Sequence, residues 1–247
     1  LERRDQCVEY VDLIEAAQQR NGIEILCDFY SFEHLIVGKF WTSIEALSNN
    51  QFVRFSGGEY FGLDAYLNKF VKDLKGLDIH LVMFVDGAKG SSKIGTEQKL
   101  ETWKFRHNRD LKNLRDIMDI SSGKKDIKNL APRTSVRPVC LELQVFETLK
   151  ECNCEVVQCP SGEADFVIAR NLELRPRAFA VLSNDSDFCV FKNCRFIPND
   201  LFDLENDLQL GKPQPLPDQP LRLRCGCILS EKVVHILEVS FIIDIVI

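Results

Sequence analysis

The chain has 247 residues, of which 45% are hydrophobic and 28% are charged, so it can bury the core of one large domain or two small ones. Its ten cysteines lack the spacing of a secreted disulfide framework, which favours reduced thiols in an intracellular protein. The apolar runs are too short, or too often interrupted by charge, for a transmembrane helix, so no membrane partner is expected.

Strand and helix patterns alternate along residues 23–197. Runs rich in strand formers predict strands, and apolar residues spaced three or four apart predict helices. In chain order, the expected elements are a strand over 23–29, a helix over 60–74, a strand over 79–85, helices over 100–118 and 139–149, a strand over 154–157, a short helix from about 162 to 172, and strands over 178–182 and 194–197. This alternation predicts an α/β domain with a mainly parallel central sheet flanked by helices.

A basic segment over 89–137 interrupts an acidic chain whose net charge is −6. The segment has 13 Lys and Arg against six Asp and Glu, a net charge of +7, whereas the rest of the chain has 18 against 31, a net charge of −13. Such a segment is typical of a polyanion-binding surface, although a solvated helix face has the same composition. Its part over 121–138 carries glycine and proline and is expected to be a mobile basic loop or the descending part of an arch.

Four prolines over 210–220 predict a stiff linker. Residues 1–209 then form the expected α/β domain, and 221–247 form the start of a truncated C-terminal region. The chain begins at Leu1 and stops inside an apolar run, which suggests a piece of a longer protein.

Two cysteine clusters leave two interpretations open. They consist of Cys152, Cys154 and Cys159, and of Cys225 and Cys227. Zinc ligands have such spacings, but histidine partners are missing at ligand spacing, so buried small hydrophobes are the favoured interpretation.

Carboxylates follow four of the expected strands. They are Asp28 after 23–27, Asp86 after 79–85, Glu163 and Asp165 after 154–157, and Asp185 and Asp187 after 178–182. Each could be a helix cap or a turn residue taken alone. Together they are expected to meet, because the carboxyl ends of parallel strands share one edge of a sheet. Six converging carboxylates repel one another unless hard divalent cations lie between them.

The pair in "SNDSDF" is expected to face the same crevice as Asp86 and Glu163. Its strand is apolar throughout and belongs in the sheet interior. Asp185 and Asp187 lie two residues apart, and such residues share a side of an extended segment. Two Mg²⁺ or Mn²⁺ ions held by such carboxylates suit phosphodiester hydrolysis.

The motifs "FVDGAKG", "SGEADFVIA" and "LSNDSDF" resemble the flap-endonuclease/XPG superfamily of PIN-like nucleases. The longer pattern from "GGEYFGLDAYLNKF" through "KLETWKFR" to "CRFIP" is similar to the Asteroid branch, over residues from about 23 to 198. The resemblance implies a PIN-like domain made of XPG N-terminal and internal regions. The basic segment would be the variable helical arch or insert between them. It also implies metal-dependent nuclease chemistry and a location in the nucleus rather than the cytoplasm.

The resemblance assigns all six acids to the metal site. It places Lys93, Lys99 and Arg106 where family nucleases use basic helix residues on the scissile phosphate. We expect nucleic-acid phosphates to be bound by the basic segment, through Lys99, Lys104, Arg106, Arg109, Lys112, Lys124 and Lys125.

Three functional hypotheses follow. The first is a metal-dependent nuclease acting on structured or single-stranded DNA or RNA, which the six acids favour. The second is a PIN-like scaffold that binds nucleic acid or a signalling partner without cutting. It is favoured by the first motif, where Asp28-Phe29-Tyr30 stands in place of the usual Asp-Gly-Asn. The third, a small PIN-toxin ribonuclease, is disfavoured by the long basic insert.

Overall fold

The structure is a computed structural model, and it describes residues 4–48, 59–87, 93–126, 140–160, 164–202 and 222–237. The described residues include a seven-stranded sheet with the order β1-β7-β6-β5-β2-β3-β4. Its strands are β1 (Val8–Asp12), β2 (Ile23–Asp28), β3 (Ile79–Val85), β4 (Glu155–Gln158), β5 (Ala178–Ser183), β6 (Arg195–Pro198) and β7 (Arg224–Leu229). The strands from β6 to β4 are parallel, whereas β7 pairs antiparallel with both β6 and β1.

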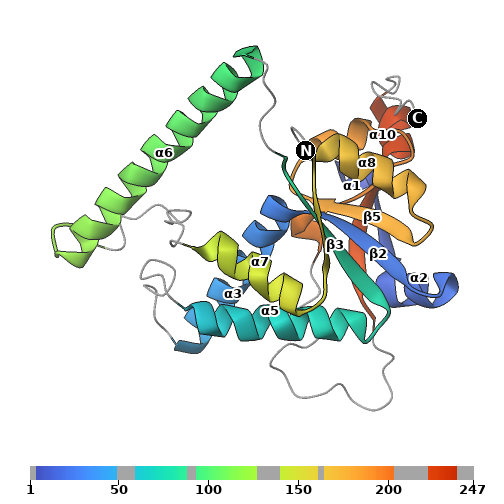
Figure 1. Cartoon of the computed structure of the whole chain (residues 1–247), viewed down its shortest axis with the longest axis horizontal. Coiled ribbons are helices and arrows are strands. Elements are labelled where there is room, and N and C mark those ends of the chain that lie inside the picture. Colours follow the sequence, from blue (N-terminus) through green and yellow to red (C-terminus); the bar gives the residue numbers. More distant parts are fainter. Residues whose placement is uncertain are drawn as a thin grey trace.

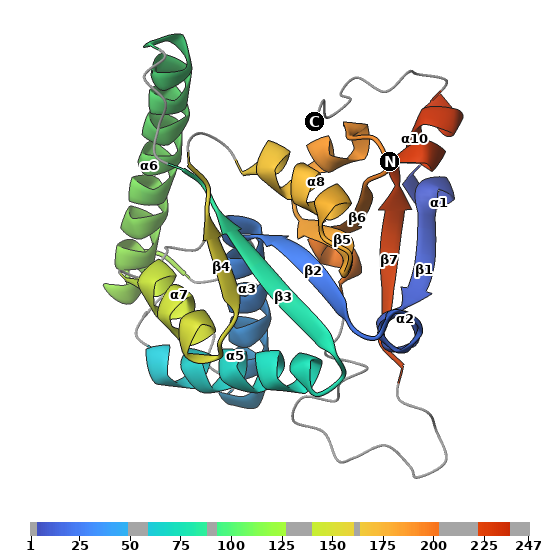
Figure 2. The same cartoon turned by 45° about the vertical axis from the view of Figure 1, so that its right-hand side comes forward.

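Helices cover both faces of the sheet (Figures 1 and 2). One face carries α2 (Leu13–Arg20), α3 (Phe29–Ser48), α5 (Tyr60–Lys75) and α7 (Leu141–Glu151). The other face carries α1 (Arg4–Cys7), α8 (Asp165–Leu174), α10 (Ser230–Leu237) and the 3-10 helix η2 (Ser186–Val190). A further 3-10 helix, η3 (Asn199–Leu201), follows β6.

The sheet has a hydrophobic core on each face, and alternate residues of the central strands pack into one core or the other, as the pleat of a strand requires. On β2, Ile25 and Cys27 enter the core beneath α3 and α5, and Leu26 enters the core beneath α8. All six residues of β5 are buried. The α/β domain with a mainly parallel sheet is therefore confirmed, and its apolar central strands have helices on both faces.

The five expected strands are present, with small shifts at their ends. Phe29 was expected to end the first strand, but it begins α3 instead. The physical reason is local, since the carboxylate of Asp28 accepts the backbone N–H of Tyr30 at 3.2 Å and turns the chain into the helix.

Strands β1 and β7 were not predicted from the sequence. β7 reads RCGCIL, which is poor in the β-branched and aromatic residues that mark strands. The strand needs a small residue at Gly226, because a Cβ there would lie 2.9 Å from Leu201 Cδ1 and 3.1 Å from Val8 Cγ1. β7 lies in the segment assigned above to a C-terminal region, and it pairs within the same sheet as the rest. The expected linker lies outside the described residues.

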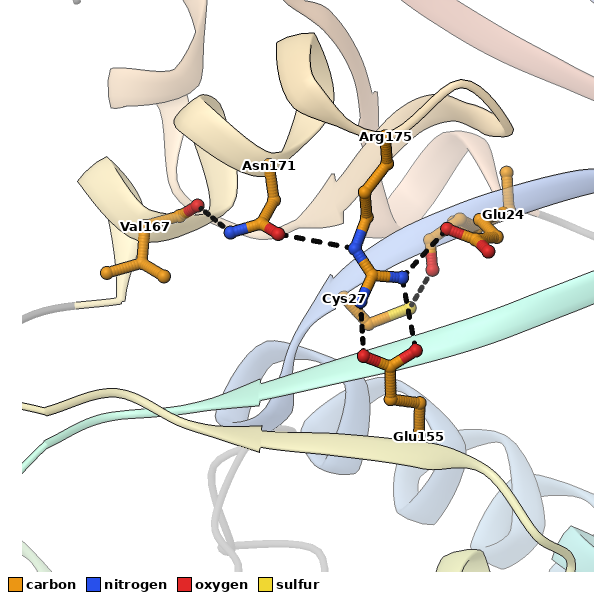
Figure 3. A network of polar contacts seen from close by, with 7 residues as sticks. Glu24, Cys27, Glu155, Val167, Asn171 and Arg175 are labelled. Carbon is orange, nitrogen blue, oxygen red and sulfur yellow. Dashed lines mark hydrogen bonds and ion pairs between the residues drawn. The ribbon is translucent and has the colours of Figure 1, made fainter. Parts of the chain in front are cut away.

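An ion-pair network holds the amino end of the sheet (Figure 3). Arg175, which follows α8, bonds Glu24 of β2 at 2.9 Å and both carboxylate oxygens of Glu155 of β4. Asn171 accepts from Arg175 Nε at 3.2 Å and donates to the carbonyl of Val167 at 2.8 Å. These hydrogen bonds, first those to Glu155, raise the pKa of Arg175. The network fixes α8 over the sheet, at the end opposite the candidate acids.

Helix α6 (Lys93–Ser121) projects from the body formed by the sheet and its flanking helices, as Figure 1 shows. It was expected to begin at residue 100 and is two turns longer at its start. Exposed apolar side chains follow its length, including Trp103 and Phe105, which are 43% and 71% exposed. A helical basic insert is therefore present, and most of the expected loop after it lies outside the described residues.

All ten cysteines are free thiols. Cys152, Cys154, Cys225 and Cys227 are buried within the core, as expected for small hydrophobes. Burial raises the pKa of Cys154 to about 11, so its thiol stays protonated at neutral pH. Among the helices that the structure describes, none is long and apolar enough to cross a membrane.

Candidate functional site

The acids after β2, β3 and β5 lie along one edge of the sheet. Asp28 is the last residue of β2, and it pairs in register with Phe84, two residues before Asp86. On its other side, Cys27 pairs with Leu182, which places Asp28 beside Ser183 at the end of β5. We call this carboxyl edge, with Asp28, Asp86, Asp165, Asp185 and Asp187, the acidic edge.

Asp28 is held by hydrogen bonds from three groups of the chain. Its carboxylate accepts from the Ser31 hydroxyl at 2.5 Å, from the Tyr30 N–H at 3.2 Å and from the Ser183 hydroxyl at 3.4 Å. Burial raises the pKa of Asp28, these hydrogen bonds oppose the rise, and the nearby charge of Asp86 adds to it. The cost of ionising Asp28 is thus caused first by desolvation and second by a neighbouring acid, both of which a cation would offset.

Ser183 connects Asp28 to the loop after β5. Its hydroxyl is fully buried and accepts the backbone N–H of Asp185 at 3.1 Å. Asp185 in turn caps η2, because its carboxylate accepts the N–H of Asp187 at 3.0 Å. The alternation argument for Asp185 and Asp187 was wrong, since the chain turns into a 3-10 helix at Ser186 and is not extended there. Both acids are exposed.

Asp86 is tied to the start of α8. Its carboxylate accepts the backbone N–H of Ala164 at 2.9 Å, and its carbonyl accepts from the Gln158 side chain at 2.6 Å. Burial, and after it the charges of Asp86 and Asp165, raise the pKa of the Cys159 thiol. Asp165 is the first residue of α8 and directly follows Ala164, whose N–H bonds Asp86, so Asp165 lies at the acidic edge close to Asp86.

Some of the expected site residues lie outside what can be described. Glu163 falls between the described ranges, and Lys93 and Lys99 lie in α6 at positions whose side chains are not described. The basic residues further along the insert are exposed, namely Lys104, Arg106, Arg109, Lys112, Lys124 and Lys125.

Two of these basic residues lie close to acids of the same insert. Lys125 pairs with Asp116 at 2.5 Å and with Asp119 at 3.6 Å, and Arg109 lies 3.4 Å from Asp110. The hydrogen bond from Lys125 lowers the pKa of Asp116. Phosphate binding by Lys125 would therefore compete with these two carboxylates.

Sequence reasoning missed the hydroxyls of the site. Ser31 and Ser183 lie 3.2 Å apart and both reach the carboxylate of Asp28. Tyr30 was noted only as part of the altered first motif, and its hydroxyl donates to Glu142 of α7 at 2.9 Å, joining the starts of two helices. The only available signal was position, because Ser31 follows Asp28 by three residues, the spacing of a helix N-terminal contact.

The donor chemistry of the acidic edge fits Mg²⁺ or Mn²⁺, because carboxylate oxygens are hard ligands and the charge of Asp86 adds to the rise in the pKa of Asp28. The described residues contain no group of three or more His, Cys, Asp and Glu side chains placed to hold a metal ion. Glu163, the remaining expected ligand, is not among them.

No protein-family model matches the sequence, and no curated protein matches it either. Solved structures do match the fold. The catalytic core of Rad2 in complex with DNA substrate aligns with a TM-score of 0.50 at 13% identity, over 97% of this chain and 56% of that chain. Human GEN1 in complex with Holliday junction DNA aligns with a TM-score of 0.46 at 13% identity, over 97% of this chain and 46% of that chain.

A third alignment is with the Holliday junction-resolving enzyme GEN1 in complex with product DNA and a Mg²⁺ ion, with a TM-score of 0.44 at 16% identity, over 92% of this chain and 38% of that chain. The chain thus spans little more than half of the Rad2 core. At these identities the alignments show the fold alone. With its seven-stranded sheet between helical layers, the chain has the PIN-like α/β fold of the Rad2 catalytic core.

Proposed function

We propose that the chain is a nuclease domain that hydrolyses phosphodiester bonds of nucleic acid at the acidic edge with the help of divalent cations. The observation that carries the proposal is the placement of Asp28 and Asp86 at the same ends of two adjacent parallel strands, where the charge of Asp86 adds to the rise in the pKa of Asp28. A fold has little reason to keep such a pair at one edge unless a cation compensates it. The Rad2 core, which has this fold, was solved with a DNA substrate.

In this proposal, Asp28, Asp86, Glu163, Asp165, Asp185 and Asp187 would hold two Mg²⁺ or Mn²⁺ ions. Two such ions activate water and stabilise the charge that develops on the phosphate. The chain itself orients the carboxylates. Ala164 N–H holds Asp86, and the buried hydroxyl of Ser183 holds Asp28 and the backbone of Asp185.

Phosphates would be guided to this edge by the exposed basic residues of α6, with Lys93 and Lys99 closest to the scissile group as the resemblance implies. We further propose that the chain belongs to the Asteroid branch of the flap-endonuclease/XPG superfamily, on the longer pattern from "GGEYFGLDAYLNKF" through "KLETWKFR" to "CRFIP". A nuclear location fits a DNA substrate and ten free thiols.

A cleavage assay with Asp86→Asn tests the proposal. The substitution keeps an oxygen that accepts from Ala164 N–H, and it removes the charge. We expect the Mg²⁺-dependent cleavage rate of a labelled branched DNA to fall by about a hundredfold or more, equivalent to about 2.7 kcal/mol of barrier. The matched control is Asp78→Asn, an exposed residue just before the other end of β3 whose φ of 57° suits asparagine.

The proposal fails if Asp86→Asn and Asp78→Asn cut equally well.

A second function, nucleic-acid binding without cutting, is favoured by one observation. The carboxylate of Asp28 already accepts three hydrogen bonds from the chain itself. If the wild-type protein binds DNA in a salt-dependent way but cuts neither DNA nor RNA with Mg²⁺ or Mn²⁺, this second function replaces the first.

A further inference from the structure

Phe166 is an exposed aromatic residue at the acidic edge. It is the second residue of α8, directly after Asp165, and its side chain is 56% exposed. The same helix buries Ile168 and Ala169 against the sheet. Helical periodicity therefore turns Phe166 away from the core while it stays next to the acid.

The ring of Phe166 is held in place by other aromatic residues. It contacts Phe191 edge-to-face, with ring centroids 5.4 Å apart and planes at 87°. Phe191 is buried and lies 5.9 Å from the buried ring of Phe188, which stacks on Phe196 at 6.0 Å. An edge-to-face contact covers at most one face of the Phe166 ring, so ring surface remains exposed while the ring is anchored to the core.

Phe166 and Phe191 belong to two different segments, each of which carries acids of the acidic edge. Ala164, two residues before Phe166, donates to Asp86. Phe191 follows η2, which contains Asp187. The ring contact between Phe166 and Phe191 thus joins the segment of Asp165 to the segment of Asp185 and Asp187. A substrate phosphate at these acids would bring an adjacent base within reach of the Phe166 ring.

A single exposed phenylalanine is ordinary on a protein surface. Phe61 of α5 is one, at 90% exposure, on the other face of the sheet. Phe166 differs because its ring packs on Phe191 and because it directly follows Asp165 of the acidic edge. A fixed ring loses little conformational entropy when a flat partner stacks on it.

We propose that Phe166 determines substrate specificity by stacking on an unpaired base next to the acidic edge. This rests on the proposed function, because the substrate is taken to be nucleic acid at the same site. Stacking on an aromatic side chain tolerates any base but needs a base that is not covered by neighbouring base pairs. The residue would therefore select nucleic acid with an unpaired nucleotide at this position and reject a continuous duplex.

The test compares a single-stranded DNA with an abasic strand of equal length, both bound in EDTA so that metal-dependent cleavage does not interfere. The abasic strand keeps the phosphates and lacks the bases. We expect the wild-type protein to bind the base-containing strand about tenfold more tightly. Phe166→Ala and Phe166→Leu should lose most of this preference, Phe166→Trp should keep it, and Phe61→Ala should leave it unchanged.

The outcomes separate the two proposals. If Phe166→Ala keeps the full preference for bases, or if the wild-type protein binds both strands equally, the stacking role is overturned and the nuclease proposal stands. If the wild-type protein binds neither strand, the stacking role is overturned, whereas the nuclease proposal is decided by the cleavage assay with Mg²⁺. The melting temperature of each variant shows that it is folded, which an exposed position favours.

Discussion

Ser183 shows how a single buried hydroxyl organises the acidic edge. It is fully buried at the end of β5, donates to Asp28 and accepts the N–H of Asp185. The geometry of two acids therefore depends on one uncharged side chain.

Replacing Ser183 by Ala should lower the free energy of unfolding by about 1 kcal/mol, because a hydrogen bond is lost on each side of the hydroxyl. It should also reduce the rise in melting temperature that Mn²⁺ produces, since Asp28 and Asp185 lose their common support. Denaturant unfolding and thermal scans with and without Mn²⁺ measure both effects.

Ser122→Ala is the matched control, because the exposed Ser122 hydroxyl donates to a carbonyl of α6 at 3.2 Å. A Ser183→Ala variant with the stability and the Mn²⁺ response of Ser122→Ala would show that the hydroxyl does not position the acids.

The acids themselves were predictable at the residue scale, whereas their supports were not. Asp28 and Asp86 follow recognisable strands, so their place at one edge follows from the parallel sheet. Ser183 stands inside the quoted motif "SNDSDF", but its bond to Asp28 spans 155 residues. Contacts that long depend on the register between β2 and β5, which no local spacing encodes.

At the scale of elements, α6 is the feature that departs most from the compact fold. Its side chains from Glu101 to Arg109 are exposed, and they include Lys104, Arg106 and Arg109 beside two aromatic residues. The helical pattern in the sequence predicted the helix, because its apolar residues recur at a spacing of three or four. Such a pattern usually marks a buried face, whereas the structure shows these apolar residues exposed.

Replacing Lys104, Arg106 and Lys112 by Ala should flatten the salt dependence of single-stranded DNA binding. Each lost phosphate contact reduces the slope of log affinity against log salt by about 0.7, so the slope should fall by about 2. Binding measured at several salt concentrations gives the slope, and sequence preference should not change.

The control for this charge change replaces Lys69, Lys72 and Lys150, three basic residues of α5 and α7, by Ala. Equal slopes in the two triple variants would show that the basic side chains of α6 form only a solvated face.

Helix and strand ends were less predictable than the elements themselves. α6 begins at Lys93, well before the first apolar residue of its pattern, because polar residues continue a helix without adding to the periodicity. β7 was missed because its residues are not typical strand formers. Its Cys-Gly-Cys core fits a closely packed position between β1 and β6 that only tertiary contacts define.

At the scale of the whole molecule, one sheet brings together acids that are far apart in the sequence. Residues 28, 86 and 185 follow β2, β3 and β5, three adjacent parallel strands. The opposite end of the sheet is closed by the Arg175 network (Figure 3). The polarity of the sheet thus separates a structural end, held by paired charges, from an end where like charges accumulate.

The central claim is that this second end binds divalent cations. The most direct measurement is anomalous diffraction from crystals of the protein soaked in Mn²⁺. We predict anomalous peaks within coordination distance, about 2.2 Å, of carboxylate oxygens of Asp86 and of at least two other acids of the edge. Their absence from crystals of Asp86→Asn would confirm the assignment. Ordered carboxylates at this edge with no anomalous peak beside them, at Mn²⁺ concentrations that support cleavage by other metal-dependent nucleases, would contradict it.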